Sequence, residues 1–158
     1  MGAERIGACE IQDTGRPFYG VYYGQAALPH APERLFYLDN AVIRGLRVYN
    51  VETSSDIPVY DLGAAAGRDP YEMFLGGARS IIKITNPNAA QERRLIVFRD
   101  SFGSSIAPLL AAGYSEITLV DIRCISPLSL GKLIDFAKAD DVLFLYSASV
   151  INNSETIQ

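Results

Sequence analysis

The C-terminal half of the chain alternates between short apolar runs and segments with helical spacing. Three runs, at 95–98, 116–121 and 141–147, have the composition of buried strands. Two segments lie between them, one beginning at Ser104 or Ser105 and ending at Gly113, the other at 126–139, and their apolar residues recur at helical spacing. Strand, helix, strand, helix, strand in this order implies parallel strands joined by crossover helices. The sequence therefore predicts an α/β fold with an open, mainly parallel sheet.

The chain has the length of a single domain, residues 1–158, and can bury a core of its own. Residues 1–67 are rich in Tyr, Gly and Pro, which predicts an irregular N-terminal part of short strands and loops. Residues 68–158 carry the predicted βαβαβ core. A further strand is predicted at 80–85, ahead of that core.

The stretch "GRDPYEMFLGG", residues 67–77, predicts a short helix. Asp69 can cap it, Pro70 suits its first position, and Glu72 completes a capping box. Glycines at 76 and 77 then end the helix, as glycine does at C-termini.

Composition excludes several classes of function. The net charge is −4 and the basic residues are scattered, so nothing forms the basic stripe that a nucleic-acid backbone requires. No window approaches the roughly 18 apolar residues of a membrane span, and the start lacks the pattern of a secretory signal. Apolar residues make up 49% and charged residues 20%, which is typical of a folded globular chain.

Counts of metal-binding and redox residues are low. Cys9 and Cys124 are far apart and have no CxxC spacing, so neither a redox motif nor a metal site is predicted. We expect free thiols, with a disulfide left open. His30 is the single histidine, so any serine activated by an imidazole of this chain must use it. No cofactor and no metal is predicted.

Polar residues follow each of the three predicted parallel strands. They are Arg99, Asp100, Ser101, Asp121, Arg123 and the segment 147–153. Ligands of open α/β sheets bind outside the carboxyl ends of the strands, which is where these residues fall. A helix that begins just after Ser101 also aims free backbone N–H groups at this place, as an anion or an oxyanion requires.

Each of these residues has a purely structural alternative. A serine before a helix is usually an N-cap that contributes roughly 1 kcal/mol of stability. Asp121 and Arg123 can form an ion pair at a strand end, and 151–154 can be a tail loop. His30 lies in a Pro-rich loop and can be an ordinary exposed histidine.

The pieces "DPYEMFLGG", "FRDSFG", "LVDIR" and "VLFLYSASVINNS" occur in this order. Together they resemble the C-terminal half of the DHHW family, which comprises bacterial proteins related to SGNH-like hydrolases and alginate O-acetylation proteins. The resemblance runs from about residue 57 to the end and, more faintly, through "FYGVYYG". It implies a three-layer SGNH or flavodoxin-like sheet and an extracytoplasmic location in the cell envelope.

The resemblance implies that Ser101 is the catalytic nucleophile. Backbone N–H groups of Ser101 and the residues after it would hold the oxyanion. The residues expected to bind or line the pocket are Arg99, Asp100, Phe102, Gly103, Asp121, Arg123 and Asn152. The family's Asp-His pair lies N-terminal to this serine, and the motif that carries it has no counterpart here. We therefore expect either a fragment of a longer protein, which fits better, or a short relative that has lost the chemistry.

Two functions follow. The first is an SGNH-like serine esterase or O-acetyltransferase for acylated cell-envelope carbohydrate, inactive as this isolated chain, because general-base assistance is worth roughly 10²–10⁴ in rate. The alternative is a non-catalytic carbohydrate-binding or assembly module of the same fold. A phosphate or nucleotide binder ranks last, since no glycine-rich phosphate motif follows any strand. A segment missing from the fold would expose an apolar face, so a homodimer is also considered.

Overall fold

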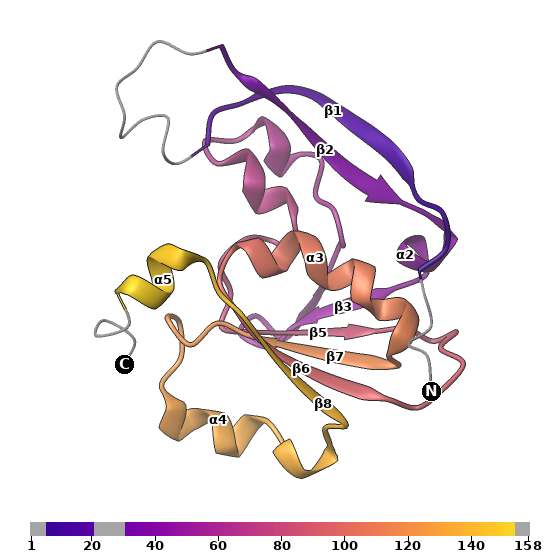
Figure 1. Cartoon of the computed structure of the whole chain (residues 1–158), viewed down its shortest axis with the longest axis vertical. Helices are drawn as coiled ribbons and strands as arrows, with labels where there is room; N and C mark the ends of the chain where they lie inside the picture. Colours follow the sequence, from indigo (N-terminus) through magenta and orange to yellow (C-terminus); the bar gives the residue numbers. More distant parts are fainter. Residues whose placement is uncertain (1–5, 21–30, 154–158) are drawn as a thin grey trace.

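The computed structural model describes residues 6–20 and 31–153, and its centre is a six-stranded sheet. The strand order is β4-β3-β5-β7-β6-β8 (Figure 1). Pairs β6–β7 and β6–β8 are parallel, whereas β7–β5, β5–β3 and β3–β4 are antiparallel. The sheet is therefore mixed, and the prediction of a mainly parallel sheet was wrong. The helical segments between the strands indicated which strands are parallel, but no pattern predicted the direction of the other strands.

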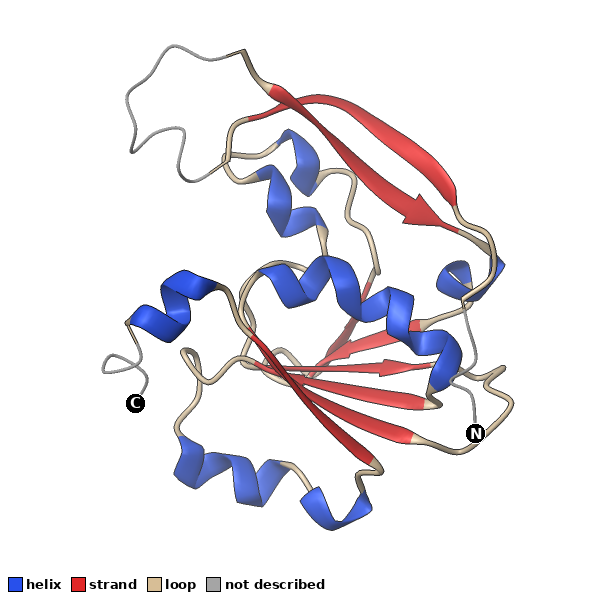
Figure 2. Ribbon diagram, viewed as in Figure 1, coloured by secondary structure: helices blue, strands red, loops and turns tan. Residues whose placement is uncertain are grey.

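The parallel half has the predicted βαβαβ order. Its strands are β6 (Arg94–Arg99), β7 (Glu116–Val120) and β8 (Asp141–Leu145), and its helices are α3 (Phe102–Leu110) and α4 (Pro127–Leu133). Single-turn 3₁₀ helices follow α3 at Ala111–Gly113 and α4 at Phe136–Lys138. A short helix, α5 (Ala148–Asn152), follows β8. Figure 2 shows α3 and α4 on opposite faces of the sheet.

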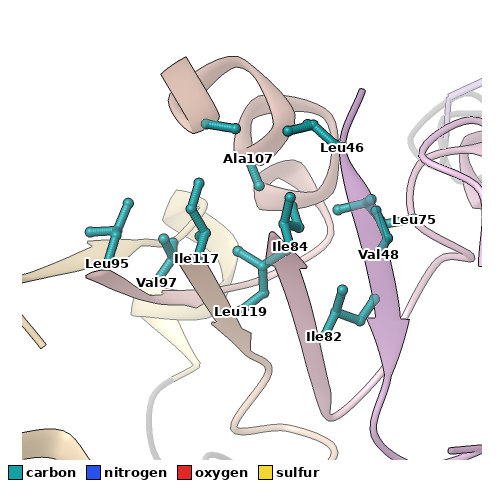
Figure 3. Close-up of a cluster of buried hydrophobic side chains, with 11 residues drawn as sticks. Leu46, Val48, Leu75, Ile82, Ile84, Leu95, Val97, Ala107, Ile117 and Leu119 are labelled. Carbon is teal, nitrogen blue, oxygen red and sulfur yellow. The ribbon is translucent and has the colours of Figure 1, made fainter. Parts of the chain in front are cut away.

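Side-chain alternation along the strands builds the two apolar layers. Odd-numbered residues of β6 and β7, such as Val97 and Leu119, pack beneath Ala107 of α3 (Figure 3). Even-numbered residues such as Ile96 and Val120 face Leu130 of α4 on the other side. Helices thus cover both faces, as an open α/β sheet requires. The SGNH-type arrangement of three layers stays a prediction.

The antiparallel half comes from the middle of the chain. Its strands are β3 (Arg47–Asn50), β4 (Ser55–Ile57) and β5 (Ile81–Thr85). The last of them agrees with the predicted strand at 80–85. Strands β3 and β4 precede residue 67 in sequence, yet they extend the same sheet as the βαβαβ core.

A separate two-stranded sheet comes from the N-terminal residues. It is the antiparallel pair β1 (Glu10–Phe18) and β2 (Glu33–Asp39), followed by the short helix α2 (Ala41–Arg44). Leu35 of β2 packs with Met73 and Phe74 in a cluster apart from the two layers of the large sheet. The sequence predicted short strands and irregular loops here. It did not show the length of β1, because residues on both faces of this strand are exposed and give no clear alternation of apolar and polar residues.

The "GRDPYEMFLGG" stretch forms the punctuated helix that the sequence predicted, as a 3₁₀ turn over Pro70–Met73 with a second turn before it at Ala64–Ala66. The Asp69 carboxylate accepts a hydrogen bond from the Tyr71 N–H at 3.0 Å. Leu75, Gly76 and Gly77 then adopt positive φ angles of 54°, 71° and 78°. Left-handed backbone is costly for leucine, so this turn is held by its buried surroundings.

Two predicted helix boundaries differ from the structure. Helix α3 begins at Phe102 rather than at 104 or 105, and Pro108 lies in its last turn and not in its first. The second predicted helix, 126–139, is interrupted at Ile134, which has extended backbone and a buried side chain. Burial of Ile134 in the core therefore outweighs continuation of the helix. No helix in the described ranges has the length and apolarity that crossing a membrane requires.

Candidate active site at the strand ends

The carboxyl ends of β6 and β7 form the switch point of the sheet. From β6 the chain crosses to α3 on one face, and from β7 it crosses to α4 on the other. In open α/β proteins, ligands bind outside the strand ends at such a reversal. Residues 99–101 and 121–123 meet there, as the sequence predicted.

Asp100 ties the end of β6 to α3 and to the chain that follows β8. Its Oδ1 accepts a hydrogen bond from the Phe102 N–H at 3.0 Å, and its Oδ2 accepts one from the Ser147 N–H at 2.6 Å. The residue is 1% exposed. The carboxylate therefore caps α3 and also fixes the chain that leaves β8.

Ser101 is free of the capping role that is usual for a serine before a helix. It has helical backbone angles, φ −57° and ψ −31°, and its side chain makes no cap hydrogen bond. The residue is exposed, in contrast to Asp100 beside it. The structural alternative for Ser101 is therefore wrong, because Asp100 is the cap. What remains is an exposed hydroxyl at the switch point.

The backbone N–H groups at the start of α3 are already in use. Phe102 donates to Asp100 Oδ1, Gly103 to Asp100 O at 3.1 Å, and Ser104 to Ser101 O at 3.1 Å. Of the donors expected to hold an oxyanion, those of Phe102, Gly103 and Ser104 are therefore already bonded. An early helix start, with an aspartate cap and a tight turn, satisfies these groups internally.

Arg99 lies under the helix start and is completely buried. Its Nη1 is 3.8 Å from Asp121 Oδ2, and its other contacts are long, at 3.4–3.5 Å to the carbonyls of Gly77, Arg79 and Asp100. Burial lowers the pKa of Arg99, an effect that Asp121 opposes. Its Nε has no partner among the described residues. The guanidinium thus supports the site from below rather than contacting a ligand from solvent.

Asp121 is shared between two arginines. Arg123 donates from Nε to Asp121 Oδ1 at 2.9 Å and from Nη2 to Oδ2 at 2.6 Å. These hydrogen bonds raise the pKa of Arg123. The Arg123 side chain is 38% exposed, so its outer edge is the accessible positive charge of the cluster. The ion pair expected from the sequence is present, and it is bidentate.

Gly103 and Phe102 have different surroundings. A Cβ on Gly103 would lie 2.5 Å from Cβ of Arg99, so the glycine allows α3 to rest on the arginine stem. Phe102 is 52% exposed and lies on the outer side of the helix start. Gly103 is therefore a packing residue, whereas the Phe102 ring is accessible to a ligand.

Asn152 is the predicted site residue that the structure does not connect to the others. It is exposed at the last position of α5, which leads away from the end of β8 (Figure 1). No hydrogen bond in the described part of the chain joins it to Ser101 or to the arginines. A five-residue helix that begins at Ala148 was not visible in the sequence pattern.

The structure adds residues that the sequence did not indicate. Tyr146 has a buried hydroxyl without a partner in the described chain, and burial, followed by the charges of Asp121 and Asp100, raises its pKa. Tyr71 donates to Ser105 Oγ at 2.7 Å beside the start of α3. Glu52 accepts from the Ser80 N–H at 2.6 Å, and hydrogen bonds from Ser80 lower its pKa. Glu52 lies at this edge only because β3 pairs with β5, and Tyr71 because the 3₁₀ turn over Pro70–Met73 contacts α3.

A base for Ser101 is not found in the described part of the chain. His30 lies outside the described residues. Both oxygens of Asp100 and of Asp121 already accept hydrogen bonds or ion pairs. No group of three or more His, Cys, Asp or Glu side chains in residues 6–20 and 31–153 is arranged to hold a metal. Cys9 and Cys124 are free thiols.

Comparison with known proteins gives a structural match without a sequence match. No protein-family model matches the chain. No curated protein matches it.

Solved structures do match. PatB1 of Bacillus cereus, in a structure with a sulfonyl adduct, aligns over 90% of this chain with a TM-score of 0.68 and 23% identity. A DHHW family protein from Eubacterium siraeum aligns over 94% with a TM-score of 0.68 and 21% identity. A second structure of Bacillus cereus PatB1 aligns over 91% of this chain with a TM-score of 0.66 and 21% identity. The alignments cover 48%, 52% and 50% of those chains, so this chain spans about half their length. The chain therefore shares its fold with PatB1 and with a DHHW family protein.

Proposed function

We propose that the chain is the serine-bearing part of an SGNH-like esterase or O-acetyltransferase that acts on acylated carbohydrate of the cell envelope. The observation that carries the proposal is the Ser101 hydroxyl, which is exposed and uncommitted at the switch point while the buried Asp100 caps the helix. A serine kept only for capping would be bonded to the helix start.

The shared fold supports a nucleophile at this place. A sulfonyl group bound as an adduct implies a reactive nucleophilic side chain, and PatB1 has been solved in that state. In the present chain the turn after β6 lies at the strand ends, where open α/β proteins bind their ligands. Arg123, with its half-exposed guanidinium, is suited to orient a carbohydrate or to stabilise developing negative charge.

The isolated chain should turn over poorly. A serine hydroxyl without a base loses roughly 10²–10⁴ in rate, and the N–H groups after Ser101 are bonded within the helix start. Full activity would then require the Asp-His pair that the DHHW resemblance places on a preceding segment.

A fluorophosphonate probe tests the proposal. Slow modification of Ser101 is expected by mass spectrometry, abolished by Ser101→Ala and accelerated by added imidazole, which supplies a base. Ser126 offers a matched control, because it is an exposed serine that precedes α4 without a cap hydrogen bond. Equal modification of Ser101 and Ser126, or no response to imidazole, would contradict the proposal.

The alternative is a non-catalytic carbohydrate-binding module that uses the same strand ends. The observation that favours this alternative is that the N–H groups at the start of α3 already have acceptors, so they do not form an oxyanion site. Calorimetry with acetylated and free glycans separates the two functions. The enzyme should prefer the acyl group, whereas a binding module should bind both and be unaffected by Ser101→Ala.

A further inference from the structure

Strand β8 forms one edge of the large sheet, and the side chains at its centre are apolar and exposed. It pairs with β6 on one side, and the described chain provides no partner on its other side. Val142, Leu143 and Phe144 are 50%, 36% and 67% exposed. Parallel strands are normally covered on both faces, and natural sheet edges usually carry a charge, a proline or a bulge that discourages pairing. The centre of β8 carries none of these.

The opposite edge of the same sheet shows the contrast. Strand β4 is three residues long and carries Ser55 and Asp56, so it is short and polar. Such an edge is protected against added strands. The difference between the two edges indicates that β8 is built to be covered.

The backbone of β8 has a definite orientation. The Asp100 N–H donates to the carbonyl of Leu145 at 3.4 Å, so the peptide groups of Leu145 face β6. Peptide groups alternate in direction along a strand, and those of Val142 and Phe144 therefore face outward. A two-fold antiparallel pairing centred on Leu143 requires outward-facing peptide groups on the residue before it and on the residue after it. Val142 and Phe144 meet this requirement.

The side chains of β8 are self-complementary in that register. Val142 lies opposite Phe144 of the second copy, and Leu143 lies opposite the same residue of its partner. Asp140 and Asp141 lie opposite Tyr146 and Leu145, so no like charges face each other. An aromatic residue opposite a β-branched one is a favourable cross-strand pair. The acidic end of each strand therefore does not oppose the pairing.

We propose that a second copy of this chain pairs with β8, antiparallel and centred on Leu143, to make one sheet that is continuous across a two-fold axis. The axis places both α4 helices on the same face. The rings of Phe136, Phe98 and Phe144 are stacked in a row on that face, with centroid separations of 6.3 Å and 4.9 Å. The exposed Phe144 ring at the end of this row becomes covered by Val142 of the second copy.

Cysteine cross-linking tests the register. In a background of Cys9→Ser and Cys124→Ser, Leu143→Cys brings two thiols opposite each other at a non-hydrogen-bonded pair, with Cα atoms about 4.5 Å apart. Disulfides form over such distances. Mild oxidation should convert most of this variant to a covalent dimer. Val142→Cys is the matched control, because its diagonal partner lies roughly 7–8 Å away and should not cross-link.

Mass measurement by light scattering tests the interface itself. The wild-type chain should have twice the 17.2 kDa monomer mass and dissociate on dilution. Leu143→Lys places two like charges at the axis and should yield a monomer with unchanged circular dichroism. Leu128→Lys, at an 88% exposed leucine of α4, should remain dimeric. A wild-type monomer, a dimer that survives Leu143→Lys, or equal cross-linking at 142 and 143 would overturn the proposal, and the edge would then be free for a different polypeptide.

Discussion

Nη1 of Arg99 lies 3.8 Å from Oδ2 of Asp121, and both side chains are completely buried. The same carboxylate holds Arg123 at 2.6 and 2.9 Å. The buried Asp121 carboxylate thus balances two positive charges, that of the buried Arg99 and that of the partly exposed Arg123. Removing the charge of Asp121 should therefore affect the fold and not merely the site.

Asp121→Asn should lower the free energy of unfolding by about 3–5 kcal/mol, because it leaves a buried guanidinium without a counter-charge. Urea denaturation measures this loss. Asp135→Asn removes a carboxylate that pairs with Lys138 at the surface, and it should change stability little. Similar losses in both variants would show that Arg99 does not depend on Asp121.

Gly103→Ala should destabilise the protein by roughly 1–3 kcal/mol, because the added Cβ would lie 2.5 Å from Cβ of Arg99. Gly131→Ala in α4 is the matched control, since a Cβ there meets nothing within 4 Å. It should stabilise by up to about 1 kcal/mol through helix propensity. Thermal unfolding of both variants gives the comparison, and a harmless Gly103→Ala would contradict the packing role.

Asp100→Ala should cost roughly 2–4 kcal/mol, the sum of a lost cap and of a buried N–H left without its charged acceptor. Hydrogen exchange should show loss of protection at the amides of Phe102 and Ser147 together, because one carboxylate serves both. Asp100→Asn keeps a single acceptor and should protect one amide only. Protection of both amides in the alanine variant would refute this account.

Tyr60 should make the fold sensitive to alkali. Burial raises its pKa to about 12, and its hydroxyl donates to the carbonyl of Leu38 at 2.8 Å. The unfolded chain ionises near pH 10, roughly the ordinary tyrosine value, and so loses its proton first. Stability contributed by neutral Tyr60 is therefore present below about pH 10 and lost as the pH rises toward about 12.

Tyr60→Phe checks this behaviour. The variant should lose about 1 kcal/mol at neutral pH, where a hydrogen bond is removed. It should also show a shallower decline in stability above pH 10 in a series of urea denaturations. If the stability of the variant fell with pH above 10 as steeply as that of the wild type, the decline would be due to other tyrosines.

The parallel half was predictable because its signals are local. Apolar runs of strand length alternate with helical spacing, and the carboxyl ends of parallel strands share one edge, so Arg99, Asp100, Ser101, Asp121 and Arg123 could be grouped from the sequence. The DHHW resemblance pointed to the same serine, and the fold match to a DHHW family protein supports the resemblance but does not test the serine.

What could not be predicted depends on long-range pairing. Glu52 reaches the site edge only because β3 pairs with β5, and Tyr71 only because a 3₁₀ turn packs on α3. The role of Asp100 was also hidden, since a serine and an aspartate before a helix are equally good caps and the choice depends on which side chain is buried. Roles in catalysis stay predictions for every site residue.

The hydrogen bonds of Arg99 to the carbonyls of Gly77 and Arg79 connect β6 with a turn that lies 22 and 20 residues earlier in the sequence. A relative that shortened Arg99 would leave those carbonyls to find new donors, but it would still need glycine at 103, because the close approach is to Cβ of residue 99. We therefore expect the 77–79 turn and position 99 to change together as such sequences diverge, while glycine stays at 103 whether or not the serine before it retains its chemistry.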